Sequence, residues 1–285
     1  MVTSSRRVSV VRMHGQSGSP VEDVVAVEEP LEVRLHGRPF AVIMRTPGAD
    51  RELVAGFLLA ERVIVDPADL GTIGHCTDVD ATHPENVVNV TLVGEAASRV
   101  DEIVNGRRRV VAHSSCGLCG RQTIAGLKTD IAPLSSRMRV SPSVIETLPV
   151  RLREAQVVFG TTGGLHAAGL FDPNGTLLDI AEDVGRHNAV DKVVGRRVLR
   201  EALPLDETVL FVSGRTSFEI VQKAALAGVP MVASVSAPSS LAIDLAAEMG
   251  IALIGFVRGK SFNLYSFADR VSGVPPAVSS PPPAL

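Results

Sequence analysis

Apolar and polar residues alternate along the first part of the chain in short runs that are typical of β-strands. Strands are expected over 23–27, 31–35 and 40–44, with a turn at His36-Gly37 between the last two. The chain is therefore predicted to open with a β-rich region.

After Pro47-Gly48 the apolar residues recur at helical spacing, which predicts a helix. Asp50 stands where an N-cap residue is expected. Another strand is predicted over 86–93, and Asn105-Gly106 predicts a turn before an extended segment at 109–112. The apolar positions of the predicted helix are Leu53, Val54, Phe57, Leu58 and Val63.

The pattern changes near residue 141. Ser141-Pro142 is typical of a helix start, and Pro149 is expected to end that helix. Further on, the Pro and Asn-Gly chemistry of residues 172–175 predicts a tight hairpin turn between two apolar segments. No later hairpin is expected.

Helices and strands then alternate, and the strands are apolar on both faces. This pattern is typical of a parallel sheet covered by helices, so the second half is predicted to be an α/β domain. Helices are expected over 189–201, 217–227 and 240–249, and strands over 208–212, 230–235 and 251–257.

Composition indicates a tail at each end. Residues 1–20 carry no uninterrupted apolar stretch of the kind that a signal peptide needs, and they are expected to form a flexible tail. Residues 273–285 are rich in Pro and Ser and are expected to be disordered. Between the tails we expect a smaller, β-rich α+β domain over 21–140 and the α/β domain over 141–272.

The overall composition is that of an ordinary globular protein of about two domains, with 285 residues, 45% of them hydrophobic and 21% charged. Lys and Arg number 28 against 31 Asp and Glu, a net charge of -3 that argues against binding of nucleic acid. No run of about 18 uncharged apolar residues exists to span a membrane. The odd count of 3 cysteines fits a reducing compartment, and a cytoplasmic location is expected.

Cys116 and Cys119 form a C-x-x-C pair within a Ser- and Gly-rich segment. One thiol of such a pair generally has a lowered pKa, and the thiolate is the form that attacks sulfur or binds metal. His113 and Arg121 are near enough in sequence to stabilise a thiolate. The pair is therefore expected to be chemically reactive.

Several chemistries are open to the pair. Zinc binding would need more ligands than two cysteines and the nearby His113 supply. A thioredoxin-type pair should open a helix directly after a strand, and cysteines that serve only packing normally lie in apolar elements. Sulfur transfer through a persulfide needs an exposed, mobile thiolate, which this segment offers. Cys76 has no second cysteine nearby in sequence and is interpreted as a packing residue.

His166-Ala167-Ala168 partly matches the H-x-E zinc motif of nucleobase deaminases, whose other half is P-C-x-x-C. Ala168 stands where the general acid/base Glu is required, and Ser115 replaces the Pro. The cysteines also precede the histidine. Deaminase activity is therefore not expected.

Residues 182–192 concentrate seven polar or charged side chains before an amphipathic helix. Arg186 offers a planar fork for phosphate or carboxylate, and Asn188 could cap the helix that follows. The alternative interpretation is a solvated helix face.

Two further segments are expected at the carboxyl ends of strands, where open α/β sheets bind ligands. Ser213, Gly214 and Arg215 lie between an apolar strand and a helix, where free N–H groups favour an anion. The segment after the last predicted strand contains Phe256, Val257, Arg258, Gly259, Lys260 and Ser261. Nucleotide phosphates would suit both segments, although no P-loop or dinucleotide glycine motif is present.

The motifs taken together resemble those of a known family, the formate dehydrogenase accessory sulfurtransferases called FdhD. C-G-x-C combined with EDVGRHNAVDK is a specific signature. The resemblance covers nearly all of the chain between the two tails. The matching segments are 44–61, 114–120, 163–171, 182–195, 213–228 and 256–266.

The resemblance implies a cytoplasmic, homodimeric sulfur carrier without a resident metal. It implies that Cys116 receives sulfur from a cysteine desulfurase as a persulfide and that Cys119 assists or resolves it. The acceptor would be the molybdenum or tungsten bis-(molybdopterin guanine dinucleotide) cofactor of formate dehydrogenase, with contacts at residues 256–261. The resemblance also implies a three-layer, cytidine deaminase-like fold for the second half.

Two other functions stay open. The chain could be a non-catalytic chaperone that binds the cofactor and its client enzyme while the cysteines only shape their loop. It could also be a zinc-dependent enzyme.

Overall fold

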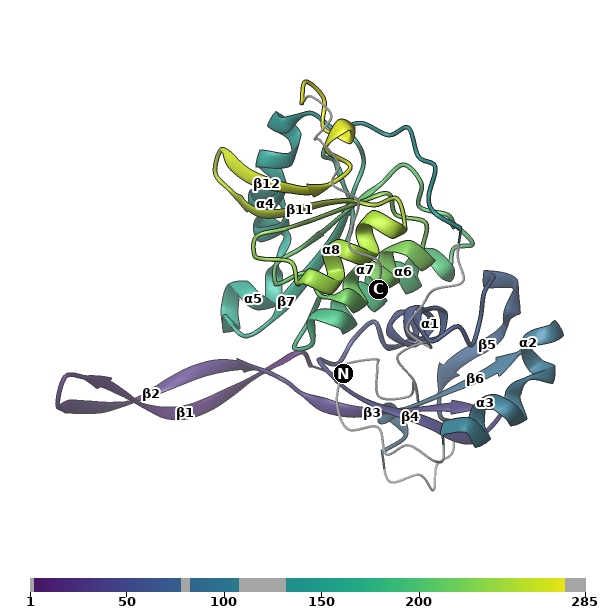
Figure 1. Cartoon of the computed structure of the whole chain (residues 1–285). Helices are drawn as coiled ribbons and strands as arrows, with labels where there is room; N and C mark the ends of the chain where they lie inside the picture. The colour runs from purple at the N-terminus through teal and green to yellow at the C-terminus, as the bar shows by residue number, and fades with distance from the viewer. Residues whose placement is uncertain (1–2, 78–82, 108–131, 275–285) are drawn as a thin grey trace.

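The computed structural model describes residues 3–77, 83–107 and 132–274, and these form three β-sheets with helices packed against two of them (Figure 1). The extended segment expected at 109–112 and most of the expected C-terminal tail lie outside the described residues.

The first sheet is a long two-stranded hairpin of β1 (Ser5–His14) and β2 (Ser17–Ala26) that extends away from the rest of the molecule (Figure 1). The flexible tail predicted for residues 1–20 is therefore wrong over most of its length. Every residue of β1 pairs with one of β2, from Ser5 opposite Ala26 to His14 opposite Ser17. Gly15, at φ 62°, supplies the left-handed backbone that the tight turn requires.

The second sheet has four strands in the order β4-β3-β6-β5, and the strands expected in this region are confirmed. Two local predictions are wrong. Ala49, at φ 55°, is the N-cap of α1 in place of Asp50, and Asn105-Gly106 lies inside α3 instead of forming a turn. The elements of this half are β3 (Glu29–Leu35), β4 (Arg38–Arg45), α1 (Asp50–Ala60), β5 (Leu70–His75), β6 (Val87–Leu92), α2 (Gly94–Ser98) and α3 (Val100–Arg107).

The third sheet has six strands in the order β12-β11-β10-β9-β7-β8. The adjacent strands β9, β10 and β11 run parallel, and the predicted alternation of helices and strands that builds them is confirmed. The elements are α4 (Pro142–Ala155), α5 (Val157–Thr162), β7 (His166–Phe171), β8 (Leu177–Asp183), α6 (Arg186–Val198), β9 (Val209–Val212), α7 (Phe218–Leu226), β10 (Met231–Ser234), α8 (Ser240–Glu248), β11 (Ala252–Arg258) and β12 (Ser261–Ser266).

The parallel strands are covered on both faces, which explains why they are apolar throughout. Helices α6, α7 and α8 lie on one face and α4 lies on the other (Figure 1). All residues of β9 and β10 are buried. The mixed α/β architecture predicted from the sequence is confirmed.

Two predictions about this half are wrong. Pro149 does not end α4, because Leu148 and Leu152 are buried beside it and this packing offsets the lost backbone hydrogen bond. The hairpin at 172–175 is present between β7 and β8, but it is not the last one. β11 pairs with β12 across a second tight turn, in which Gly259 adopts φ 55°.

Helices α1 and α6 join the two halves of the molecule at unusually close range. An added Cβ at Gly195 would lie 1.8 Å from the carbonyl oxygen of Glu52, and one at Gly56 would lie 2.0 Å from the carbonyl oxygen of Asp191. The helix backbones therefore touch directly. A single buried apolar cluster includes residues from both helices, so the halves share one core.

None of the described helices is both long and apolar enough to cross a bilayer.

We predict that Gly195→Ala lowers the free energy of unfolding by at least about 2 kcal/mol, because the new methyl group forces two backbones apart. Urea denaturation would measure this loss. The matched control is Gly160→Ala in α5, where an added Cβ meets nothing within 4 Å. The control should be neutral or stabilising by up to about 1 kcal/mol. Equal stabilities for the two variants would contradict the close contact.

Candidate functional site

The structure brings the two predicted ligand segments, 213–215 and 256–261, to the same edge of the six-stranded sheet. They follow β9 and close β11, whose carboxyl ends lie on either side of the end of β10. The Phe256 N–H donates to the Ser236 carbonyl at 3.1 Å, and Arg258 Nε donates to the Val235 carbonyl at 3.0 Å. The last segment is thus tied to the loop after β10. Cys116 and Cys119 lie outside the described residues.

A pocket of about 480 Å³ opens at this edge. Its size falls within the range of small-molecule sites, and its walls are mainly apolar with a few polar groups, which is the usual composition of such sites. It is lined by Pro149, Leu152, Arg153, Gln156, Phe159, Gly163, Gly164, Leu165, His166, Phe211, Ser213 and Val235.

Ser213 is held rigidly at the mouth of the pocket. Its Oγ accepts the Ala167 N–H at 2.8 Å, and its own N–H donates to the Ala167 carbonyl at 2.9 Å. These bonds fix the loop after β9 against the beginning of strand β7. Ser213 and His166 therefore face the same pocket from neighbouring strands.

Cationic groups gather around His166. Burial lowers the pKa of His166, and the guanidinium groups of Arg186 and Arg215 lower it further. The imidazole is therefore neutral at physiological pH, with one donor and one acceptor nitrogen. Gly214 allows the crowding, since an added Cβ there would lie 3.4 Å from His166 Nδ1 and 3.8 Å from Arg186 Cδ.

Arg186 has an unused hydrogen-bond donor in this cluster. Its Nε is buried, and it has no hydrogen-bond partner within the described part of the chain. A buried donor without a partner is costly, and guanidinium groups favour phosphate and carboxylate oxygens. Arg186 and Arg215 are thus suited to bind an anion beside the pocket.

The last residues of β11 include a left-handed residue at an irregularity of the strand, followed by exposed cations. Phe256 adopts φ 54°, a left-handed conformation that is uncommon outside glycine. The Arg258 guanidinium lies 5.6 Å from the centre of the Phe256 ring. Arg258 and Lys260 are exposed, and Arg258 is hydrogen-bonded to the carbonyl of Val235, which lines the pocket.

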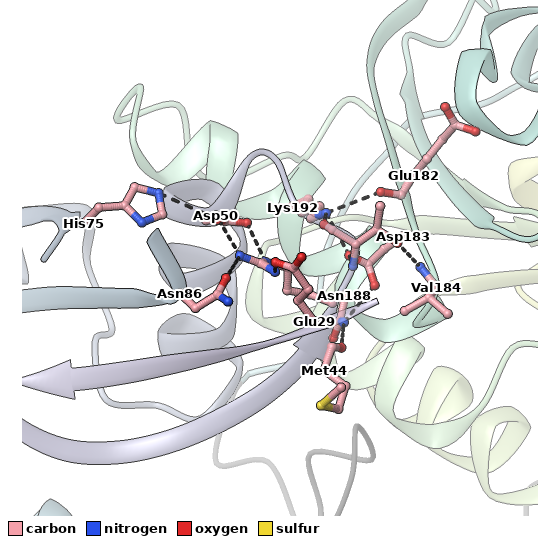
Figure 2. A network of polar contacts seen from close by, with 12 residues as sticks. Glu29, Met44, Asp50, His75, Asn86, Glu182, Asp183, Val184, Asn188 and Lys192 are labelled. Atoms are coloured by element: carbon pink, nitrogen blue, oxygen red, sulfur yellow. Dashed lines mark hydrogen bonds and ion pairs between the residues drawn. The ribbon is translucent and has the colours of Figure 1, made fainter. Parts of the chain in front are cut away.

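The polar run at 182–192, by contrast, is mostly buried. Figure 2 shows a network of polar side chains from this run. The network joins the connection between β8 and α6 to the end of β4 and to the turn that follows β4. The alternative interpretation of this run as a solvated helix face is therefore wrong, and the expectation that Asn188 caps α6 is also wrong, because Gly185 is the N-cap. The buried members are Asp183, His187, Asn188, Asp191 and Lys192.

Asp183 is the centre of this network. Its carboxylate pairs with Lys192 Nζ at 2.7 Å and accepts hydrogen bonds from the Thr46 N–H at 3.1 Å and the Asn188 amide at 2.8 Å. Lys192 also donates to the Thr46 carbonyl at 2.8 Å, and Asn188 donates to the Met44 carbonyl at 2.8 Å. Side chains of one half therefore satisfy backbone groups of the other half.

Arg45 continues the network within the N-terminal half, where it bonds to Asp50 and Asn86, both labelled in Figure 2. Its fully buried guanidinium forms a bidentate ion pair with the Asp50 carboxylate, and both N···O distances are 3.0 Å. It also donates to Asn86 Oδ1 at 2.8 Å. Asp50 is therefore used in an ion pair, which explains why it is not free to cap α1.

A second buried cluster joins α6 to the first turns of α7. Lys223 Nζ pairs with Asp191 at 2.6 Å, and His187 Nε2 lies 3.1 Å from Glu219 and 3.0 Å from Ser217 Oγ. Burial raises the pKa of Glu219 to about 7, despite the opposing charge of Lys223. Glu219 can therefore hold a proton near neutral pH.

Several pocket residues were not singled out from the sequence. Arg153, Gln156 and Phe159 come from the junction of α4 and α5, which is distant in sequence from β9 and β11. His166 drew attention only as part of an incomplete zinc motif. The signal that could have found it is its place at the start of a strand that pairs with β9.

The comparisons with known proteins agree with one another. The FdhD/NarQ family matches residues 26–272. A protein named sulfur carrier protein FdhD from Streptomyces coelicolor is 49% identical over 276 residues, covering 95% of this chain and 96% of that protein. A protein of the same name from Streptomyces avermitilis is 48% identical over 280 residues, with the same coverage of each.

A solved structure from Desulfotalea psychrophila, described as a formate dehydrogenase accessory protein, has a similar fold. The TM-score is 0.75 at 25% sequence identity, and the match covers 94% of this chain and 100% of that one.

We predict that Lys192→Met lowers the free energy of unfolding by about 3–5 kcal/mol, because it leaves the buried Asp183 carboxylate without its counter-charge. Chemical denaturation would measure the loss. The control is Arg38→Met, which removes a surface ion pair to the exposed Asp101 and should change stability by no more than about 0.5 kcal/mol. Similar small losses in both variants would contradict the role of the network.

We predict that the stabilising effect of the Glu219 carboxyl falls as pH rises from about 5 to about 7. The folded protein keeps a proton on Glu219 over this range, whereas the unfolded chain releases it near 4.5. Glu219→Gln cannot titrate, so the stability difference between wild type and this variant should shrink or reverse with rising pH. Urea titrations at several pH values would measure it. A difference that does not vary with pH would show that the pKa of Glu219 is not raised.

Proposed function

The chain belongs to the FdhD/NarQ family, and on that premise we propose that it is a sulfur carrier that serves the maturation of a formate dehydrogenase. The names of its relatives support the carrier role, and the similar fold of a formate dehydrogenase accessory protein supports the link to that enzyme. We place its action in the cytoplasm, as a homodimer, with a cysteine desulfurase as the sulfur donor.

Cys116 is the proposed carrier. Its thiolate attacks the outer sulfur of the desulfurase persulfide, which forms Cys116–S–SH and releases the desulfurase cysteine as a thiolate. Cys119 is the proposed resolving residue. Its thiolate attacks the inner sulfur and expels hydrosulfide toward the acceptor, leaving a Cys116–Cys119 disulfide that a cellular thiol must reduce.

The proposed acceptor is the molybdenum or tungsten bis-(molybdopterin guanine dinucleotide) cofactor, held as a substrate. The observation that carries this part is the meeting of residues 213–215 and 256–261 at one sheet edge, beside a pocket and the buried Arg186 Nε, which has no hydrogen-bond partner among the residues that the structure describes. The diphosphates of the cofactor carry negative charge that Arg186, Arg215, Arg258 and Lys260 can neutralise.

We predict that exposure to a cysteine desulfurase and cysteine adds the mass of one sulfur atom to the wild-type protein and not to Cys116→Ala. Mass spectrometry under non-reducing conditions would detect the adduct. Cys76→Ala is the matched control, since Cys76 is a free, half-buried thiol elsewhere in the chain, and it should still gain the sulfur. An adduct that persists in Cys116→Ala would exclude Cys116 as the carrier.

The alternative is a chaperone that binds the cofactor without carrying sulfur. It predicts that a protein lacking both Cys116 and Cys119 still restores formate dehydrogenase activity in cells. The sulfur-carrier proposal predicts that this variant does not.

A further inference from the structure

We propose that His187, Ser217 and Glu219 form a buried proton-binding cluster, and that this cluster takes up a proton when an oxyanion binds beside it at Arg186 and Arg215. The oxyanion class that fits is phosphate-like or sulfate-like, and it includes the diphosphate of the proposed cofactor. This inference rests on the proposed function, because it concerns the groups that would bind that diphosphate. The three residues of the cluster are positioning residues, since they act on the ligand through their neighbours.

A single ring nitrogen faces two oxygen atoms in this cluster. His187 Nε2 lies 3.0 Å from Ser217 Oγ and 3.1 Å from Glu219 Oε2. The other carboxyl oxygen of Glu219, Oε1, is buried and has no hydrogen-bond partner among the described residues. A buried carboxylate with an unpaired oxygen is costly, whereas the neutral acid avoids the cost of a buried charge. The geometry therefore favours a proton that His187 and Glu219 share.

The charges around Glu219 hold this proton close to its point of release at neutral pH. Burial raises the pKa of the Glu219 carboxyl to about 7, and the negative charges of Asp191 and Glu61 add to this effect, whereas Lys223 and Arg186 lower the pKa. Lys223 is itself paired with Asp191 at 2.6 Å inside the protein. Arg186 is therefore the cation whose effect on Glu219 an arriving anion can change.

The cluster is connected to the anion-binding groups in two ways. Arg186 and His187 are consecutive residues in the first turn of α6, and the buried Arg186 Nε has no hydrogen-bond partner within the described ranges. Ser217 is the N-cap of α7, but its side chain faces His187 and makes no capping hydrogen bond. Ser217 also ends the loop that carries Ser213 and Arg215. An anion at this loop is thus linked to the proton through both charge and hydrogen bonds.

The direction of the coupling follows from the charges. An oxyanion at Arg186 offsets the guanidinium charge that stabilises ionised Glu219, so the pKa of Glu219 rises when the anion binds. By reciprocity, the anion binds more tightly when Glu219 is already protonated. The affinity for the anion is therefore expected to fall as pH rises through about 7, where Glu219 ionises.

The test is calorimetric titration of the full-length protein with sulfate at constant ionic strength, because sulfate keeps its double negative charge from about pH 6 to about pH 8. Wild-type affinity should fall about five- to tenfold over this range. Binding near pH 7 should take up part of a proton, measured from the heats in buffers of different ionisation enthalpy. Glu219→Gln cannot titrate and should show neither effect. The matched control is Glu248→Gln, which changes an exposed residue of α8 and should behave as wild type.

Two further measurements locate the effect. Arg186→Gln should bind sulfate more weakly and lose the pH dependence, because it removes the charge that joins the anion to Glu219. An NMR titration of the side-chain carboxyl carbons of the wild-type protein should show the Glu219 midpoint moving to higher pH when sulfate is added. This measurement decides the question even if Glu219→Gln folds poorly.

Each contrary outcome has a distinct meaning. Sulfate affinity that does not vary with pH would overturn the coupling and leave the proposed function standing. Proton uptake that persists in Glu219→Gln and disappears in His166→Gln would overturn the assignment to this cluster, since His166 also lies beside Arg186 and Arg215. A wild-type protein without affinity for sulfate would overturn the inference together with the proposed phosphate-binding groups, while the sulfur test on Cys116 would still decide the carrier role.

Discussion

The ion pair between Asp183 and Lys192 is the interaction on which the arrangement of this molecule depends. Both groups are buried, and each would be costly there without its partner. Both side chains also bond to the backbone of Thr46 in the turn after β4. Asp183 accepts from the Thr46 N–H, and Lys192 donates to the Thr46 carbonyl. Because the same run of chain begins α6, whose first residue is Arg186, the network fixes both the joint between the halves and the start of the helix that carries Arg186.

Much of the fold could be predicted from the sequence, because the signals were local. Apolar strands and helical spacing identified the alternation that builds the six-stranded sheet, and the loops at 213–215 and 256–261 were expected at its carboxyl edge. The failures came from tertiary context. Pro149 lies within a helix that packing stabilises, and Asn105-Gly106 is helical despite its turn chemistry. Residues 5–14 pair with residues 17–26, the strand that follows them, which composition alone does not reveal.

The candidate site was predicted only in part, since its pocket is assembled from segments that are far apart in sequence. Residues 182–192 have the composition of an exposed surface, and only the fold shows that Asp183 pairs with Lys192 and Asp191 with Lys223 inside the protein. Arg153 in α4 and Phe159 in α5 belong to no recognisable motif, and only the fold shows that they line the pocket. The spacing of residues along the sequence cannot show that distant segments line one pocket, whereas a match of sequence motifs can identify the family.

The glycine contact between α1 and α6 has a mechanical consequence. Helices that meet through side chains can slide, because side chains change rotamer, but two touching backbones offer nothing to deform. The halves are therefore stiff with respect to each other at this joint. A hinge motion at this joint would have to separate the two helix backbones, so relative movement of the halves there is strongly disfavoured.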